Sequence, residues 1–102
     1  MADGDEMIAS LGDNATADLY HGRNTHRVRR FPLAIQHIAL RKFDMLNAAD
    51  RLNDLREPSG NHLEALKGDL AGRHSIRVND QWRLVFRWED NNAHEVLLTD
   101  YH

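Results

Sequence analysis

Hydrophobic and polar residues alternate along the last third of the chain, from about residue 73 onward. Alternation with a period of two is typical of strands that have one buried face. Turn-forming residues at 79–81 and 90–93 divide this region, so we expect a three-stranded antiparallel meander. The middle strand then has two faces, with Trp82, Leu84, Phe86 and Trp88 against the core and Arg83, Val85 and Arg87 opposite.

The first half of the chain has helical spacing instead. Asp13 or Thr16 can cap a short helix that Gly22 ends. Pro32 suits the first position of a second helix, and an apolar stripe continues that helix to about residue 56. We therefore expect an α+β protein in which two N-terminal helices pack on a small, mainly antiparallel sheet that ends in the three-stranded meander.

The length of 102 residues predicts one domain, 1–102, with a first strand at Met7–Leu11 and residues 1–6 as a flexible extension. The absence of cysteine excludes disulfides, thiolate catalysis and cysteine-bound zinc. No apolar stretch is long enough to cross a bilayer, and the acidic start is unlike a signal peptide. We expect a cytoplasmic protein with no membrane partner.

Charge is unevenly distributed along the chain. Residues 1–22 contain five acidic residues and no Lys or Arg, whereas residues 23–88 contain all 13 Lys and Arg against seven acidic residues. The middle segment therefore has a net charge of +6 inside a protein whose total is −3. A local basic surface of this kind can attract a polyanion, although a solvated helix surface explains some of these residues equally well.

The chain ends in three ionisable residues, Asp100, Tyr101 and His102, directly after an apolar strand. Alternation places Asp100 and His102 on one face, while Lys67 and Arg83 can approach from the preceding loop and strand. Such a group of side chains suits RNA cleavage by the 2′-hydroxyl, which requires a base, an acid and cations around the phosphate. Histidine suits the proton transfers, and arginine and lysine suit the phosphate.

Each of these residues has an ordinary structural interpretation when it is taken alone. His102 is then a terminal residue in solvent, Asp100 an ion-pair partner of Arg83, and Lys67 part of a solvated turn. Only their convergence favours a site. The seven histidines show no metal-binding spacing, so we expect neither a metal nor a cofactor.

Three segments resemble a known family: 63–68 (LEALKG), 74–84 (HSIRVNDQWRL) and the terminal Asp-Tyr-His. They look like those of HigB toxins, members of the RelE-like superfamily of bacterial toxin–antitoxin systems. The resemblance covers nearly the whole chain from Met7. It implies a compact RelE-like fold and a ribosome-dependent endoribonuclease that cuts mRNA in the ribosomal A site. It also implies a helix-turn-helix antitoxin of the HigA type, with operator DNA bound only through the antitoxin complex.

The resemblance also implies roles for individual residues. Lys67, Arg83, Asp100, Tyr101 and His102 match positions that the family uses around the scissile phosphate. Some members have histidine where this chain has Glu64, so Glu64, Asp100 or the nearby His62 remain alternatives for the second proton carrier beside His102. The expected peripheral RNA contacts are Arg73, Lys42 and Arg87.

Two other functions fit the same fold. A ParE-like relative poisons DNA gyrase and has no use for an Asp-Tyr-His end. A non-catalytic relative acts only as the co-repressor partner of its antitoxin and is harmless when overexpressed.

Overall fold

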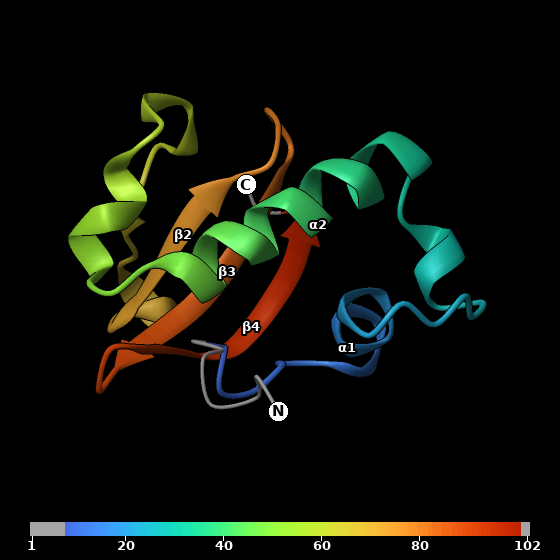
Figure 1. Cartoon of the computed structure of the whole chain (residues 1–102), viewed down its shortest axis with the longest axis horizontal. Coiled ribbons are helices and arrows are strands. Elements are labelled where there is room, and N and C mark those ends of the chain that lie inside the picture. The colour runs from blue at the N-terminus through green and yellow to red at the C-terminus, as the bar shows by residue number, and fades with distance from the viewer. Residues whose placement is uncertain (1–7, 101–102) are drawn as a thin grey trace.

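A four-stranded antiparallel sheet with helix α2 across one face forms the frame of the molecule (Figure 1). The computed structural model describes residues 8–100. The strands lie in sequence order, and the α+β class with two α-helices is confirmed. The elements are α1 (Asn14–Tyr20), α2 (Leu33–Ala48), β1 (Glu64–Ala65), β2 (Arg73–Arg77), β3 (Trp82–Glu89) and β4 (Asn92–Asp100).

The predicted meander corresponds to β2, β3 and β4, but the sheet has a fourth strand that the sequence does not indicate. β1 consists of only two residues, and it pairs with the outer edge of β2 through Glu64 opposite Ser75 and Ala65 opposite His74. Both residues of β1 are exposed, so the strand lacks the alternation of buried and exposed positions that identifies its neighbours.

The first helix begins where the sequence indicates, and the second begins at Leu33, one residue after the predicted position. The Asp13 carboxylate accepts the Thr16 N–H at 2.8 Å, which makes Asp13 the cap of α1. Thr16 has a different function, because its buried hydroxyl accepts the Leu98 N–H at 3.0 Å and ties α1 to β4. Gly22 follows α1 with a φ of +76°, and Pro32 immediately precedes the first helical residue of α2.

The predicted end of the second helix at residue 56 is wrong. α2 ends at Ala48, and Ala49 turns its buried side chain into the core from an extended backbone. The Asp54 carboxylate then accepts the N–H groups of Asp50 and Arg51 at 3.0 and 3.1 Å. These hydrogen bonds begin a separate 3₁₀ turn, Leu52–Arg56, whose Leu55 is buried.

The predicted first strand is also incorrect within the described residues. Ile8 and Leu11 form only isolated parallel bridges, to Ala93 and Val96 of β4. β4 contains an extra residue between Ala93 and Val96, the partners of the two bridges. This bulge separates the bridges, so they do not form a continuous ladder. Met7 and the proposed extension at 1–6 lie outside the described residues.

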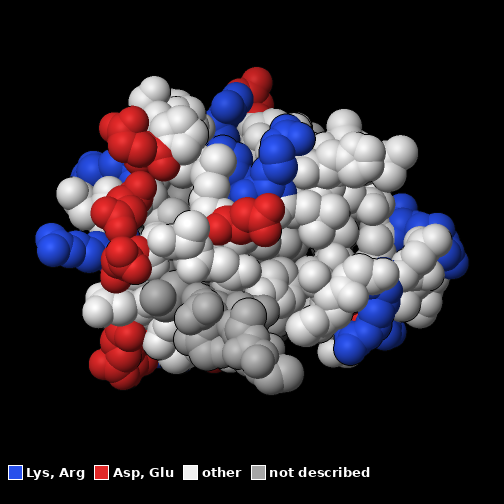
Figure 2. All heavy atoms as spheres, in the orientation of Figure 1, with Lys and Arg blue, Asp and Glu red and all other residues white. Residues whose placement is uncertain are grey.

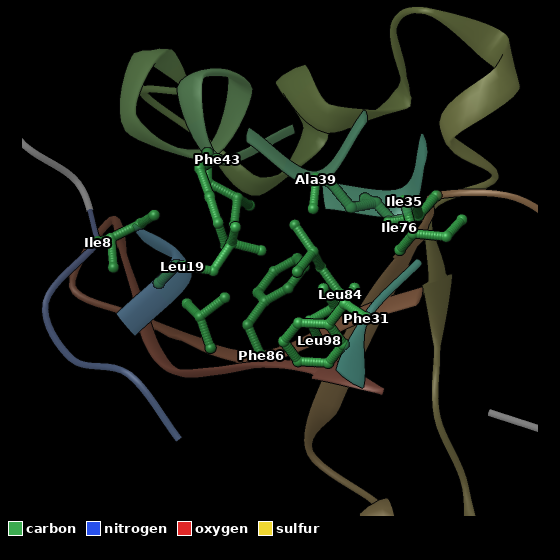
Figure 3. Packing of buried hydrophobic residues seen from close by; sticks show 14 of the residues in the cluster. Ile8, Leu19, Phe31, Ile35, Ala39, Phe43, Ile76, Leu84, Phe86 and Leu98 are labelled. Atoms are coloured by element: carbon green, nitrogen blue, oxygen red, sulfur yellow. The ribbon is translucent and has the colours of Figure 1, made fainter. Parts of the chain in front are cut away.

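The core lies between the sheet and the helices. Leu84 and Phe86 of β3 are fully buried and pack with residues from α2, as the side chains in Figure 3 show. Trp82 and Trp88 are partly buried against the same cluster, so the predicted core face of the middle strand is confirmed. Within residues 8–100, none of the helices combines the length and apolar character needed to cross a bilayer.

A buried carboxylate holds the connection between the two helices. Asp18 accepts hydrogen bonds from the Thr25 hydroxyl at 2.9 Å, Arg27 Nε at 3.0 Å and an Arg23 guanidinium nitrogen at 3.4 Å. The Thr25 hydrogen bond is the largest cause that lowers the pKa of Asp18, and the two guanidinium groups add to it while burial opposes it.

Replacing Asp18 by asparagine should reduce the loss of stability in acid. A carboxylate whose folded pKa is lowered stabilises the fold above its unfolded pKa of about 3.9, and that contribution is lost as pH falls through the folded value. Urea unfolding at pH 7 and pH 3 should show a smaller difference for Asp18→Asn than for the wild type. Asp44→Asn, at an exposed position of α2, is the control. Equal pH dependence in all three proteins would contradict the assignment.

Candidate functional site

The sheet has a second face that points away from the core cluster, and we call it the outer face. Directly paired residues of neighbouring strands share a face. Arg83 of β3 pairs with Arg77 and Thr99, and Arg87 pairs with Arg73. Because Leu84 and Phe86 point into the core, these four arginines belong to the outer face. The predicted position of Arg83 and Arg87 opposite the core is confirmed.

Arg83 is held at the centre of a small polar group on the outer face. One guanidinium nitrogen lies 3.2 Å from Glu64 Oε1 and donates to the Ser75 hydroxyl at 3.2 Å. Ser75 is fully buried, whereas about half of the Glu64 side chain is exposed. The structure therefore brings together two of the predicted catalytic residues, Glu64 and Arg83, and it does so through the short strand β1.

A second polar group lies further along the same face. Arg73 donates to Glu95 Oε1 at 2.8 Å, and Arg87 Nε lies 3.5 Å from the same oxygen. The hydrogen bond and charge of Arg73 are the largest causes that lower the pKa of Glu95, and Arg87 adds to them. Arg87 also pairs with Glu89. Two of the three predicted RNA contacts, Arg73 and Arg87, thus share one carboxylate.

Asp100 and Arg83 lie on different faces of the sheet. Asp100 is paired in register with Trp82, whose ring packs against the core cluster, while Arg83 is paired with Thr99. Asp100 Oδ2 accepts the Gln81 side-chain N–H at 2.7 Å. The strand register therefore brings Arg83 beside the end of β4 but does not bring Asp100 to Arg83.

The two predicted lysines are not part of this group. Lys67 is exposed at the start of the turn Gly68–Leu70, and its side chain makes no hydrogen bond or ion pair within residues 8–100. Lys42 is on α2, the helix side of the sheet, and donates to Asn61 Oδ1 at 2.5 Å. Burial, followed by the nearby charges of Arg41 and Arg77, lowers the pKa of Lys42.

Tyr101 and His102 lie outside the described residues, and the chain reaches them directly after β4 ends at Asp100. Across the described part of the chain, no three or more His, Asp or Glu side chains are placed to hold a metal ion.

Among the described residues, 8–100, the helix-bearing side shows no comparable row of arginines. Figure 2 shows this side, where acidic side chains gather at the left of the view and Lys and Arg are scattered. The outer face instead carries four arginines on two adjacent strands, interleaved with Ser75 and Val85.

Sequence reasoning missed Ser75 and Glu95. Alternation does place Ser75 on the face of Arg73 and Arg77, so its contact with Arg83 was available from a correct strand pairing. Glu95 had no such signal, because it is the extra residue of the β4 bulge and a bulge changes the face of a side chain without any mark in the sequence.

The fold is shared with small bacterial toxins in complex with their antitoxins. The solved structure of a YoeB–YefM complex from Staphylococcus aureus matches with a TM-score of 0.59 and 22% identity. The match covers 93% of this chain and 97% of that chain. A heterotetrameric YoeB–YefM complex from the same organism matches with a TM-score of 0.51 and 20% identity. At these identities the likeness shows the fold alone, a YoeB-like α+β fold.

Similarity of sequence gives the family. Toxin HigB-1 of Vibrio cholerae is 40% identical over 92 residues, which are 90% of this chain and 95% of that protein. An uncharacterised protein of Haemophilus influenzae is 38% identical over 79 residues, covering 78% and 76% of the two chains. A family model described as the RelE-like toxin of the type II toxin–antitoxin system HigB matches residues 10–102. The chain belongs to this HigB-like toxin family.

Proposed function

We propose that the protein is a ribosome-dependent endoribonuclease that cuts mRNA in the ribosomal A site and thereby inhibits translation. The observation that carries this proposal is the fixed Glu64–Arg83–Ser75 group on an arginine-lined face, beside the end of β4 from which the chain continues to Tyr101 and His102. Family membership supports the same activity, since endoribonuclease action is general among RelE-like toxins.

The proposed reaction uses the RNA's own 2′-hydroxyl. A base takes the 2′-hydroxyl proton, the 2′-oxygen bonds to phosphorus, and the bond to the 5′-oxygen breaks as that oxygen receives a proton from an acid. The products are a 2′,3′-cyclic phosphate and a 5′-hydroxyl. Arg83 can donate two parallel hydrogen bonds to the phosphate as negative charge builds on its oxygens. Lys67, exposed in the connection between β1 and β2, is proposed to add a second positive charge.

The structure supports Glu64 over Asp100 as the second proton carrier. Glu64 lies 3.2 Å from Arg83, whereas Asp100 is on the opposite face with Trp82. We therefore assign the two proton transfers to Glu64 and His102, with Tyr101 positioning the substrate and Asp100 in a supporting position at the end of β4. This assignment requires His102 to reach the face of Arg83 instead of sharing the face of Asp100, as strict alternation would place it. No metal takes part in this scheme.

The proposed partners are mRNA on the ribosome and a cognate helix-turn-helix antitoxin of the HigA type. The solved relatives are toxin–antitoxin complexes, which supports an antitoxin partner for this chain. Operator DNA would be bound only through that complex.

Replacing His102 by alanine should abolish growth arrest and mRNA cleavage on programmed ribosomes, because the reaction then lacks one of its two proton carriers. The matched control is His37→Ala, at an exposed position of α2 on the helix side. Full cleavage by His102→Ala would refute the terminal site. Trapped gyrase–DNA complexes in place of cut mRNA would instead indicate a ParE-like toxin.

A further inference from the structure

A hollow of about 330 Å³ opens on the outer face beside the Arg83 group. Its apolar walls come from three parts of the chain: Val85 and Leu97 of the sheet, Leu70 of the turn after β1, and Leu11 of the N-terminal segment. Arg73 and Glu95 supply its polar lining. Leu11 also packs against the main hydrophobic cluster, but Val85 is buried and stands outside that cluster, so core packing does not account for Val85.

The hollow lies next to the proposed catalytic group along β3. Val85 lines the hollow, and Arg83 is the preceding outer-face position on the same strand, about 7 Å away at the spacing of a β-strand. A nucleotide that adjoins a phosphate bound at Arg83 can therefore reach the hollow.

The backbone at Glu95 is strained in a way that points to function. Glu95 has a φ of +54°, a left-handed conformation that residues with a Cβ atom rarely adopt. The N-terminal segment holds the bulge through two hydrogen bonds. Ser10 Oγ accepts the Glu95 N–H at 2.8 Å, and the Ser10 carbonyl accepts the Val96 N–H at 3.1 Å. Gly12 allows the N-terminal segment to approach the bulge closely, because a Cβ there would lie 2.9 Å from the Glu95 carbonyl oxygen.

The side-chain interactions of Glu95 do little to offset this backbone strain in the stability of the fold. The partners of Glu95 are Arg73 and Arg87, and almost half of the Glu95 side chain is exposed, so the ion pairs contribute little to the fold. Strained residues that the surrounding structure holds in place gather at binding sites, and bulges re-aim side chains there. The bulge aims the Glu95 carboxylate at the hollow.

We infer that the hollow binds an unpaired base of the mRNA next to the cleaved bond and that Glu95 and Arg73 determine which base is preferred. The inference rests on the proposed function. The leucine and valine side chains contact the ring of the base. Glu95 Oε1 is occupied by Arg73, while Oε2 accepts no hydrogen bond within residues 8–100 and can accept an N–H from the base edge. Arg73 donates to a ring nitrogen or carbonyl oxygen of the base. Arg73 and Arg87 provide the positive charge that a polyanion requires.

The test compares Glu95→Gln with the wild type on programmed ribosomes whose A-site codon is randomised, with the cut ends mapped by sequencing. Glutamine keeps the size of the side chain but replaces one acceptor oxygen by a donor. The base preference at one position beside the cut should change about fivefold or more. Glu57→Gln, an exposed change that removes no ion pair of the described residues, should keep the wild-type pattern.

A second variant separates recognition from a structural role. Glu95→Gly relieves the positive φ, so its melting temperature should stay equal to or rise above that of the wild type, while the base preference flattens. A lower melting temperature with an unchanged cleavage pattern would show that Glu95 is only structural and would overturn the inference.

The remaining outcomes are also distinguishable. Unchanged cleavage by both variants combined with loss of neutralisation by the antitoxin would assign the hollow to the antitoxin and overturn the inference. A wild-type protein that cuts no ribosome-bound mRNA would overturn the proposed function, and this inference with it. A wild type that cuts, beside a Glu95→Gln variant with the same base preference, would overturn the inference alone.

Discussion

Replacing Arg83 by glutamine is expected to slow mRNA cleavage on ribosomes about 100- to 1000-fold, or about 3–4 kcal/mol of transition-state stabilisation. Arg83 is fixed by Glu64 and Ser75, so its guanidinium group needs little reorganisation when charge develops on the phosphate. Glutamine keeps part of the hydrogen bonding but supplies neither the charge nor the forked donor pair. Single-turnover cleavage of a defined mRNA measures the effect.

Two further variants make this result specific to the site. Arg83→Lys should recover only part of the rate, because an ammonium group binds the phosphate as a point charge. Arg30→Gln removes an exposed arginine near the start of α2 and should cut at the wild-type rate. All variants must match the wild type in melting temperature. A normal rate for folded Arg83→Gln would remove Arg83 from the reaction.

The fold was predictable wherever a periodic pattern extends over several residues. The alternation in β3 identifies both the strand and its two faces, and helical spacing identifies α2. Short elements had no such pattern. β1 has two exposed residues, and its existence depends on pairing with β2 rather than on its own sequence. The early end of α2 depends on the Asp54 carboxylate, a local hydrogen-bond acceptor that the apolar stripe does not reveal.

The candidate site shows the same division. Arg83 and Arg87 could be assigned to the outer face by counting along one strand, and the structure confirms that assignment. The pairing of Glu64 with Arg83 could not, because it requires the register between β1 and β2. Pairing of neighbouring strands predicts that Arg83 approaches the chain end, but the β3–β4 register places Asp100 opposite Trp82 and Thr99 opposite Arg83. Residue types predicted the chemistry, and strand register decided which residues meet.

The second large effect concerns the strand that carries Arg83 and Arg87. Leu84→Ala should lower the free energy of unfolding by about 2–5 kcal/mol, a large part of the roughly 5–15 kcal/mol typical of a domain. Leu84 is fully buried between the sheet and the helices, so removing its side chain leaves a cavity as well as losing burial. Leu33→Ala is the matched control, because Leu33 is 66% exposed and its change should be within about 0.5 kcal/mol.

Urea unfolding at constant m-value measures both changes in stability. The activity of Leu84→Ala then tests whether packing and chemistry are separable. Its side chain points away from Arg83, so folded protein kept at low temperature should still cut mRNA, whereas toxicity at growth temperature should fall as the unfolded fraction rises. If fully folded Leu84→Ala lost cleavage at low temperature, the outer face would depend on core packing more closely than the strand geometry implies.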